Sequence, residues 1–128
     1  VHAADFEKET AITAVPGDLL GVAIAPGLSS AAASLSSQTA QLPRVQLAPP
    51  PAAIGRNTTH SIQSGVVYGY VGLVEALIRR MRSEMGGSAL AVATGGLARV
   101  IPPLSSEFAA IEPWLTLDGL RIIADRNE

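Results

Sequence analysis

Residues 54–65 read IGRNTTHSIQSG and run directly into the apolar sequence VVYGYVGLVEALI at 66–78. Four prolines between positions 42 and 53 oppose a helix before this stretch, because proline lacks a backbone N–H and restricts the residue that precedes it. Asn57 and the two threonines after it carry side-chain oxygens that can accept from the first free N–H groups of a helix. On these local features, the stretch predicts the capped start of a long helix over residues 58–84.

Apolar residues recur along this helix at three- and four-residue steps. They are Ile62, Val66, Tyr70, Leu73, Val74, Leu77 and Met81, and Val67, Val71 and Ala76 widen the stripe. A helix that is apolar nearly all round is buried on more than one side. In so short a chain, we expect the second side to contact another subunit. Arg79, Arg80 and Arg82 in the last turns complement the helix dipole, with a solvated helix end as the alternative.

The sequence before the long helix predicts strands and one shorter helix. Residues 1–6, 10–15 and 19–25 read as three strands joined by short turns, an antiparallel meander whose third strand is buried on both faces. Residues 28–41 predict a helix rich in small residues, and 42–53 an irregular connection.

The sequence after the long helix alternates short elements. Gly86-Gly87 predicts the end of the long helix, and 89–93 a buried strand that leads through Thr94-Gly95-Gly96 into a short helix. Residues 105–110 predict a helical turn. Thr116 is expected to cap a final helix that ends near residue 124, with Leu117, Leu120 and Ile123 facing inward. The element order predicts an α/β half-domain with a mixed sheet.

Composition excludes several classes of protein. A net charge of −2 gives no basic footprint for nucleic acid, and the absence of cysteine excludes a disulfide framework or a thiolate metal site. Two histidines are too few for a histidine metal site. No uninterrupted apolar run approaches the roughly 18 residues that span a bilayer, so we expect no membrane partner and a cytoplasmic location. The chain starts without Met, and we expect it to be part of something longer.

Six short motifs follow one another along the chain. They are ADF at 4–6, GDLLGVAIAPG at 17–27, TAQLP at 39–43, IGRNTTHSIQSG at 54–65, ATGGLA at 93–98 and LTLDGL at 115–120. Together, over essentially the whole chain, they resemble the C-terminal half of a type III pantothenate kinase. The resemblance implies that residues 1–128 are a ribonuclease H-like domain of the acetate and sugar kinase, heat-shock protein 70 and actin superfamily. It also implies an N-terminal domain outside this chain and pairing of two subunits through helix 58–84.

The resemblance also implies site residues. Asp5 matches the aspartate that holds a monovalent cation, potassium or ammonium, and an oxygen ligand suits such an ion. Thr58 matches the threonine that reaches across the dimer to pantothenate. Gly95 and Gly96 match the Gly-Gly on the nucleotide side, where ATP binds with a divalent metal such as magnesium. On pattern alone, the residues favour the plainer interpretations, a tight turn for Gly95-Gly96 and a solvated hairpin for the acidic residues near Asp5.

Departures from the family pattern lie on the phosphate side. Glu7-Lys8-Glu9 replaces the Gly-Thr-Ala that follows Asp-Phe in the family, and Val22 replaces the second glycine of a Gly-Gly pair. Two carboxylates there would repel a polyphosphate unless a cation screened them.

The resemblance implies that the intact protein phosphorylates pantothenate with ATP, the first step of coenzyme A biosynthesis. The phosphate loop and the catalytic aspartate belong to the N-terminal domain, so this chain alone is expected to be inactive. The alternative is a non-catalytic partner subunit or regulatory module of a heteromeric kinase, and a structural remnant is a third possibility.

Overall fold

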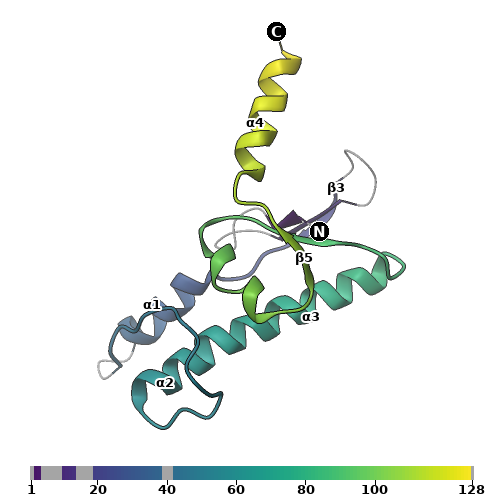
Figure 1. The fold of residues 1–128 in the computed structure, drawn as a ribbon. Coiled ribbons are helices and arrows are strands. Elements are labelled where there is room, and N and C mark those ends of the chain that lie inside the picture. The colour runs from purple at the N-terminus through teal and green to yellow at the C-terminus, as the bar shows by residue number, and fades with distance from the viewer. Residues whose placement is uncertain (1, 4–9, 14–18, 39–41, 128) are drawn as a thin grey trace.

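The computed structural model describes residues 2–3, 10–13, 19–38 and 42–127. Expectations for Asp5, for Glu7-Lys8-Glu9 and for the turn at 16–18 lie outside these residues. The described residues form a mixed sheet and a set of helices, one of which runs almost the full width of the molecule in Figure 1.

The sheet has five strands in the order β3-β2-β1-β4-β5. Their bounds are β1 His2–Ala3, β2 Thr10–Thr13, β3 Leu19–Ala23, β4 Ala91–Ala93 and β5 Phe108–Ile111. β1 pairs in parallel with β4, and β4 with β5, whereas β1 with β2 and β2 with β3 are antiparallel. The parallel pairing of β1 with β4 joins residues ninety positions apart, His2 with Val92 and Ala3 with Ala93, across the helices between them. The predicted mixed α/β sheet is therefore confirmed.

The long helix consists of three consecutive segments. α2 (Thr58–Gln63) leads into a π-helical turn, η1 (Ser64–Tyr68), and then into α3 (Gly69–Glu84). Its buried side chains are Ile62, Val66, Val67, Tyr70, Val71, Val74, Ile78 and Met81. Residues from both sides of the π turn, among them Ile62 and Val74, belong to the same hydrophobic core cluster, so both halves of the helix present an apolar face to the core. Leu73 and Ala76, which the pattern placed in the stripe, are exposed.

The core lies between the helices and the sheet. α1 (Leu28–Gln38) and the long helix lie on the same side of the sheet in Figure 1. Leu28, Val67 and Ile101 are fully buried, and Ala91 and Ala93 of β4 pack into the same cluster as the long helix. The apolar face of the helix and β4 therefore belong to one hydrophobic core.

Gly86 and Gly87 end the long helix, as the sequence predicts. Both have positive φ, +84° and +94°, which glycine adopts without strain. The Gly87 N–H donates to the Arg82 carbonyl at 2.8 Å and the Gly86 N–H to the Ser83 carbonyl at 3.3 Å. This is the Schellman arrangement, which satisfies carbonyls that a helix end otherwise leaves open.

The helical turn predicted for 105–110 is wrong. A short 3-10 turn, η3 (Pro102–Leu104), comes earlier, and Phe108–Ile111 instead form strand β5 beside β4. Pro102 and Pro103 occupy the first positions of η3, where the missing N–H costs nothing. Parallel pairing with β4, a contact between distant parts of the chain, then draws the following residues into the sheet.

Two predicted burials are also wrong. β3 is not buried on both faces: it is one of the two edge strands of the described sheet, and Leu19 and Leu20 are 65% and 59% exposed. α4 (Leu115–Arg126) starts one residue before Thr116, with Trp114 at its N-cap position and no side-chain cap bond. Leu117, Leu120 and Ile123 do not face inward, because α4 projects away from the other elements, as Figure 1 shows, and none of its residues is buried.

The span Thr58–Glu84, with 27 residues, is long and apolar enough to cross a membrane by length and composition alone. The core helix of a soluble protein passes the same test. Here the apolar face of the span packs on the sheet, and Arg79 and Arg82 near its end make ion pairs. We therefore interpret the span as a core helix.

Candidate functional site

The start of the long helix is built on Asn57. Its backbone is extended (φ −146°, ψ 168°), and its Oδ1 accepts from the His60 N–H at 2.8 Å. The Ser61 N–H donates to the Asn57 carbonyl at 2.9 Å, which begins the helical ladder. The side-chain amide of Asn57 also lies 3.2 Å from Nδ1 of His60. The predicted cap is confirmed, and Asn57 supplies its bond.

Gly55 allows the chain to approach this helix closely. A Cβ added at Gly55 would lie 2.5 Å from the backbone N, the Cα and the Oγ of Ser61. No side chain fits at that distance, because the backbone of a helix cannot yield as a flexible side chain does. The close contact with Ser61 therefore requires glycine at position 55, and it brings residues 55–57 down onto the first turn of α2.

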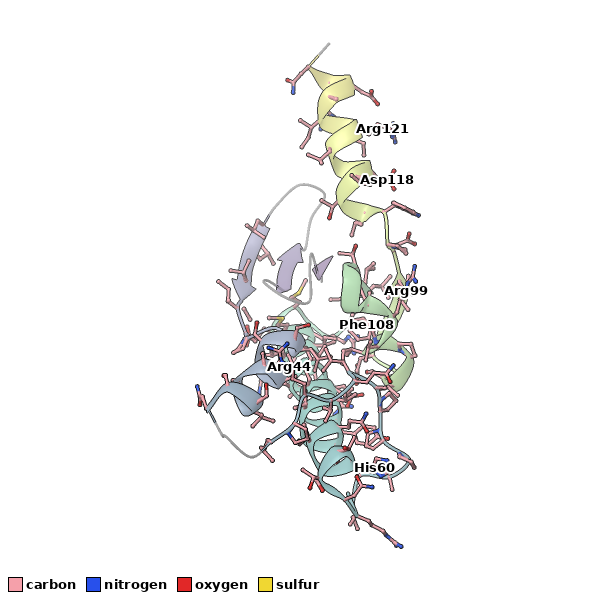
Figure 2. All side chains as sticks on the ribbon, turned by 90° about the vertical axis from the view of Figure 1, so that its left-hand side faces the viewer. Arg44, His60, Arg99, Phe108, Asp118 and Arg121 are labelled. Atoms are coloured by element: carbon pink, nitrogen blue, oxygen red, sulfur yellow. The ribbon has the colours of Figure 1, made fainter. Side chains whose placement is uncertain are left out.

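A pocket of about 560 Å³ lies between this cap and α1. Leu35, Leu42 and Ile62 form its apolar side, and Asn57, Thr58 and Ser61 its polar side, with Gly55 and Arg56 completing the wall. Thr58, the predicted substrate residue, thus lines an open pocket on the surface. Figure 2 shows this end of the long helix, marked by His60, at the opposite end of the molecule from α4.

The proline-containing connection is fixed to the long helix by side-chain hydrogen bonds. We call residues 42–57 the strap. Gln63 Nε2 donates to the Gln46 carbonyl at 3.1 Å, Tyr68 Oη to the Pro50 carbonyl at 2.8 Å, and Ser64 Oγ to the Ala53 carbonyl at 2.5 Å. Val45 and Leu47 of the strap pack against the core. The sequence predicted an irregular strap but not these bonds.

Gly95 and Gly96 lie at the end of β4. Gly95 has φ +96°, and its carbonyl accepts from the Ala98 N–H at 3.2 Å, so it makes a tight turn into the 3-10 helix η2 (Gly96–Arg99). Thr94, just before it, is buried. Neither glycine lines the pocket that holds Thr58, so the structure does not bring these predicted site residues into one cavity.

Glu107 joins the end of the long helix to the start of β5. Its carboxylate accepts from Arg79 Nε at 2.6 Å and from Arg82 Nη1 at 2.5 Å, and Arg82 Nε donates to the Ala89 carbonyl. The hydrogen bond from Arg79, and then the one from Arg82, lower the pKa of Glu107 below its ordinary value. Hydrogen bonding to Glu107 in turn raises the pKa of Arg79. These two arginines therefore make specific ion pairs; Arg79 and Arg80 are both exposed, and Arg82 is partly buried.

Glu75 extends this network. Its two carboxylate oxygens accept from Arg79 Nη2 at 3.3 Å and from Ser105 Oγ at 2.7 Å. Among the residues that the structure describes, no group of three or more His, Asp or Glu side chains is placed to hold a metal ion. The network is therefore a structural link between α3 and β5.

These observations define an α/β domain with a mixed sheet and a long capped helix that has an open pocket at its start. Residues 9–80 match the model of the type III pantothenate kinase family. The chain belongs to that family.

Curated relatives cover nearly all of this chain. The type III pantothenate kinase of Moorella thermoacetica is 48% identical over 125 residues, which are 96% of this chain and 49% of that protein. The type III pantothenate kinase of Thermomicrobium roseum is 51% identical over 124 residues, 95% of this chain and 48% of that protein. The chain thus spans about half the length of the curated relatives it matches.

A solved structure shares the fold. It is a Campylobacter jejuni protein provisionally assigned to the Baf family of transcriptional activators, with a TM-score of 0.58 and 20% identity. The match covers 85% of this chain and 48% of the other. At this identity, the likeness supports the fold alone.

Proposed function

We propose that the protein containing this chain transfers the γ-phosphate of ATP to pantothenate, the first step of coenzyme A biosynthesis. Residues 1–128 serve as its C-terminal ribonuclease H-like domain, of the actin-like ATPase class, in which β1, β2 and β3 form the antiparallel meander. The observation that carries the proposal is Thr58 at the capped helix start, lining a pocket with both apolar and polar sides. Pantothenate, which combines methyl groups with hydroxyl, amide and carboxylate groups, suits such a pocket.

The long helix provides the contact with a second subunit. Gly65, Gly69, Gly72 and Ala76 recur along one exposed face of it, and a Cβ at any of the three glycines would meet nothing within 4 Å. Small residues let two helices approach closely, because the distance between helix axes depends on the side chains at the contact. Leu73, 37% exposed, adds apolar surface beside them. This contact places Thr58 beside a site completed by the partner.

The nucleotide and ions bind on the other side of the domain in this proposal. Gly95 and Gly96 border ATP, and the absence of a side chain at Gly95 leaves the backbone open for close approach of a ligand. Asp5 holds a monovalent cation, potassium or ammonium, and magnesium enters with ATP. We place the protein in the cytoplasm, in keeping with a long helix that packs as a core helix.

The enzyme assay uses the full-length protein that carries this chain, with ATP, pantothenate, magnesium and potassium or ammonium. We expect pantothenate-dependent ADP release. Thr58→Ala should raise the KM for pantothenate about fivefold or more, as expected for one lost hydrogen bond, while Thr58→Ser retains the hydroxyl and most of the affinity. No phosphopantothenate under any of these conditions would contradict the proposal.

A second candidate is a non-catalytic partner subunit of a heteromeric kinase. Glu7-Lys8-Glu9, in place of the family's Gly-Thr-Ala, favours it, because the phosphate-side motif is altered while the stretch at 54–65 keeps the family pattern. Purification from the native cell separates the two: a fully active homodimer excludes the partner role. Calorimetry with pantothenate and with ATP tests the third possibility, since a structural remnant would bind neither.

A further inference from the structure

The strap is held at both ends of the π-helical turn. Ser64 is the first residue of that turn and Tyr68 the last, and each donates its hydroxyl to a strap carbonyl, at Ala53 and Pro50. Gln63, one residue before the turn, donates to Gln46. π-helical turns are rare within α-helices and occur frequently at functional sites. Here the turn contributes two of the three hydroxyl and amide groups that fasten the strap.

The strap in turn forms two walls of the Thr58 pocket. Leu42, at its start, lies on the apolar side, and residues 55–57, at its end, lie on the polar side. The hydrogen-bonded carbonyls of Gln46, Pro50 and Ala53 lie between these two ends. Fixing the middle of the strap therefore fixes one wall relative to the other, and with it the cap that presents Thr58.

Hydrogen bonds within the strap itself do not fix its conformation. Pro49, Pro50 and Pro51 have no N–H to donate, so the strap cannot form a ladder of its own there. The bond to Pro50 reaches across 18 positions of sequence, and its Tyr68 donor is only partly exposed, whereas the Ser64 bond is near the surface. The Tyr68 hydroxyl is thus the best-shielded of these fastenings.

We propose that Tyr68, assisted by Ser64, is a positioning residue for the substrate pocket. It acts through the strap: its hydroxyl holds Pro50, the strap holds Gly55 against Ser61, and the cap then presents Thr58. This inference rests on the proposed function, because it assigns a role in binding pantothenate. Tyr68 itself does not line the pocket.

The experiment uses Tyr68→Phe in the full-length protein, which removes only the hydroxyl. We expect the KM for pantothenate to rise about five- to tenfold, with kcat and the KM for ATP within about twofold of the parent. Ser64→Ala should raise the KM in the same way, and Ser64→Thr, which keeps a hydroxyl, should restore it in part. Ser105→Ala is the control, because it removes a hydroxyl from the hydrogen-bond network between α3 and β5, which is not part of the strap or of the pocket lining, and it should leave the KM for pantothenate unchanged.

Hydrogen exchange provides a readout that does not depend on turnover. Amides of residues 55–61 should exchange faster in Tyr68→Phe than in Ser105→Ala, because a released strap loosens the cap. An active parent whose KM is unchanged by Tyr68→Phe, or raised equally by Ser105→Ala, overturns the positioning role, as does unchanged exchange at 55–61. A parent without pantothenate-dependent ADP release is a different failure, since it removes the proposed function and this inference together.

Discussion

Gly55 shows how a single residue controls the candidate site. Its missing side chain allows the strap to meet the backbone of Ser61, and Asn57 two residues later closes the helix start. Contact, rather than an unusual backbone angle, therefore requires glycine at this position.

Gly55→Ala should destabilise the protein by about 1–3 kcal/mol, the usual cost of forcing extra volume into a packed site. The new Cβ has to displace either the strap or the first turn of α2. Urea unfolding of the full-length protein measures the change. Gly119→Ala is the control, because nothing lies within 4 Å of a Cβ there and the residue is inside α4. It should be stabilising by about 0.5–1 kcal/mol, and equal effects of the two variants would contradict the close contact.

Among the elements, α3 and β5 are joined by a carboxylate with two guanidinium partners. The pKa of Glu107 is lowered in the folded protein, so the folded state binds the proton less readily than the unfolded state. Its stabilising contribution is therefore fully present above its unfolded pKa of about 4.3 and is lost as pH falls through the lower, folded value.

Glu107→Gln should accordingly lower the Tm by a few degrees at pH 7. The difference in Tm between variant and parent should shrink progressively as the pH falls below about 4. Thermal unfolding followed by circular dichroism from pH 7 to 3 measures it. Asp125→Asn is the control, since its partner Arg121 and Asp125 itself are both well exposed and such pairs contribute little. A difference in Tm that stays constant from pH 7 to 3 would contradict the assignment of this stabilising ion pair to the Glu107 carboxylate.

At the scale of the whole molecule, we predict that two subunits pair through the exposed glycine face of the long helix, and substitutions on that face test this prediction. Gly69→Leu or Gly72→Leu in the full-length protein should convert a dimer to a monomer, because a large side chain on this face separates two closely packed helices. Light scattering after size exclusion measures the mass. Gly119→Leu makes the same change on α4 and should leave the mass unaltered. A dimer that survives both helix variants places the subunit contact elsewhere.

Periodicity predicted the parts of the fold that depend on local sequence. The helix over 58–84, its Asn57 cap and its Gly86-Gly87 end all follow from residues within a few positions of one another. The apolar spacing does not predict the π turn, because Ile62, Val66 and Tyr70 recur at the four-residue steps of an ordinary α-helix. β5 was missed because its strand form depends on pairing with β4, which local sequence does not encode.

The candidate site also has parts that the sequence predicts and parts that only the fold reveals. Thr58 was predicted from its motif, and the structure places it at a pocket. The strap bonds were not predicted, because their acceptors are backbone carbonyls, which every residue has, and only the fold selects Pro50 and Ala53. For α4, the apolar pattern of Leu117, Leu120 and Ile123 indicated a face suited to burial but not what would cover it.

The outermost strand has a practical consequence for handling this chain. β3 is an edge strand of the sheet, and the apolar side chains of Leu20 and Val22 are half exposed or more. An apolar strand at the border of a sheet is a template for pairing with another chain, and natural proteins usually guard it with lysine, proline or a bulge. The 128-residue chain kept by itself at high concentration is therefore prone to aggregate through β3, and a lysine placed at position 20 or 22 is the simplest way to keep it in solution.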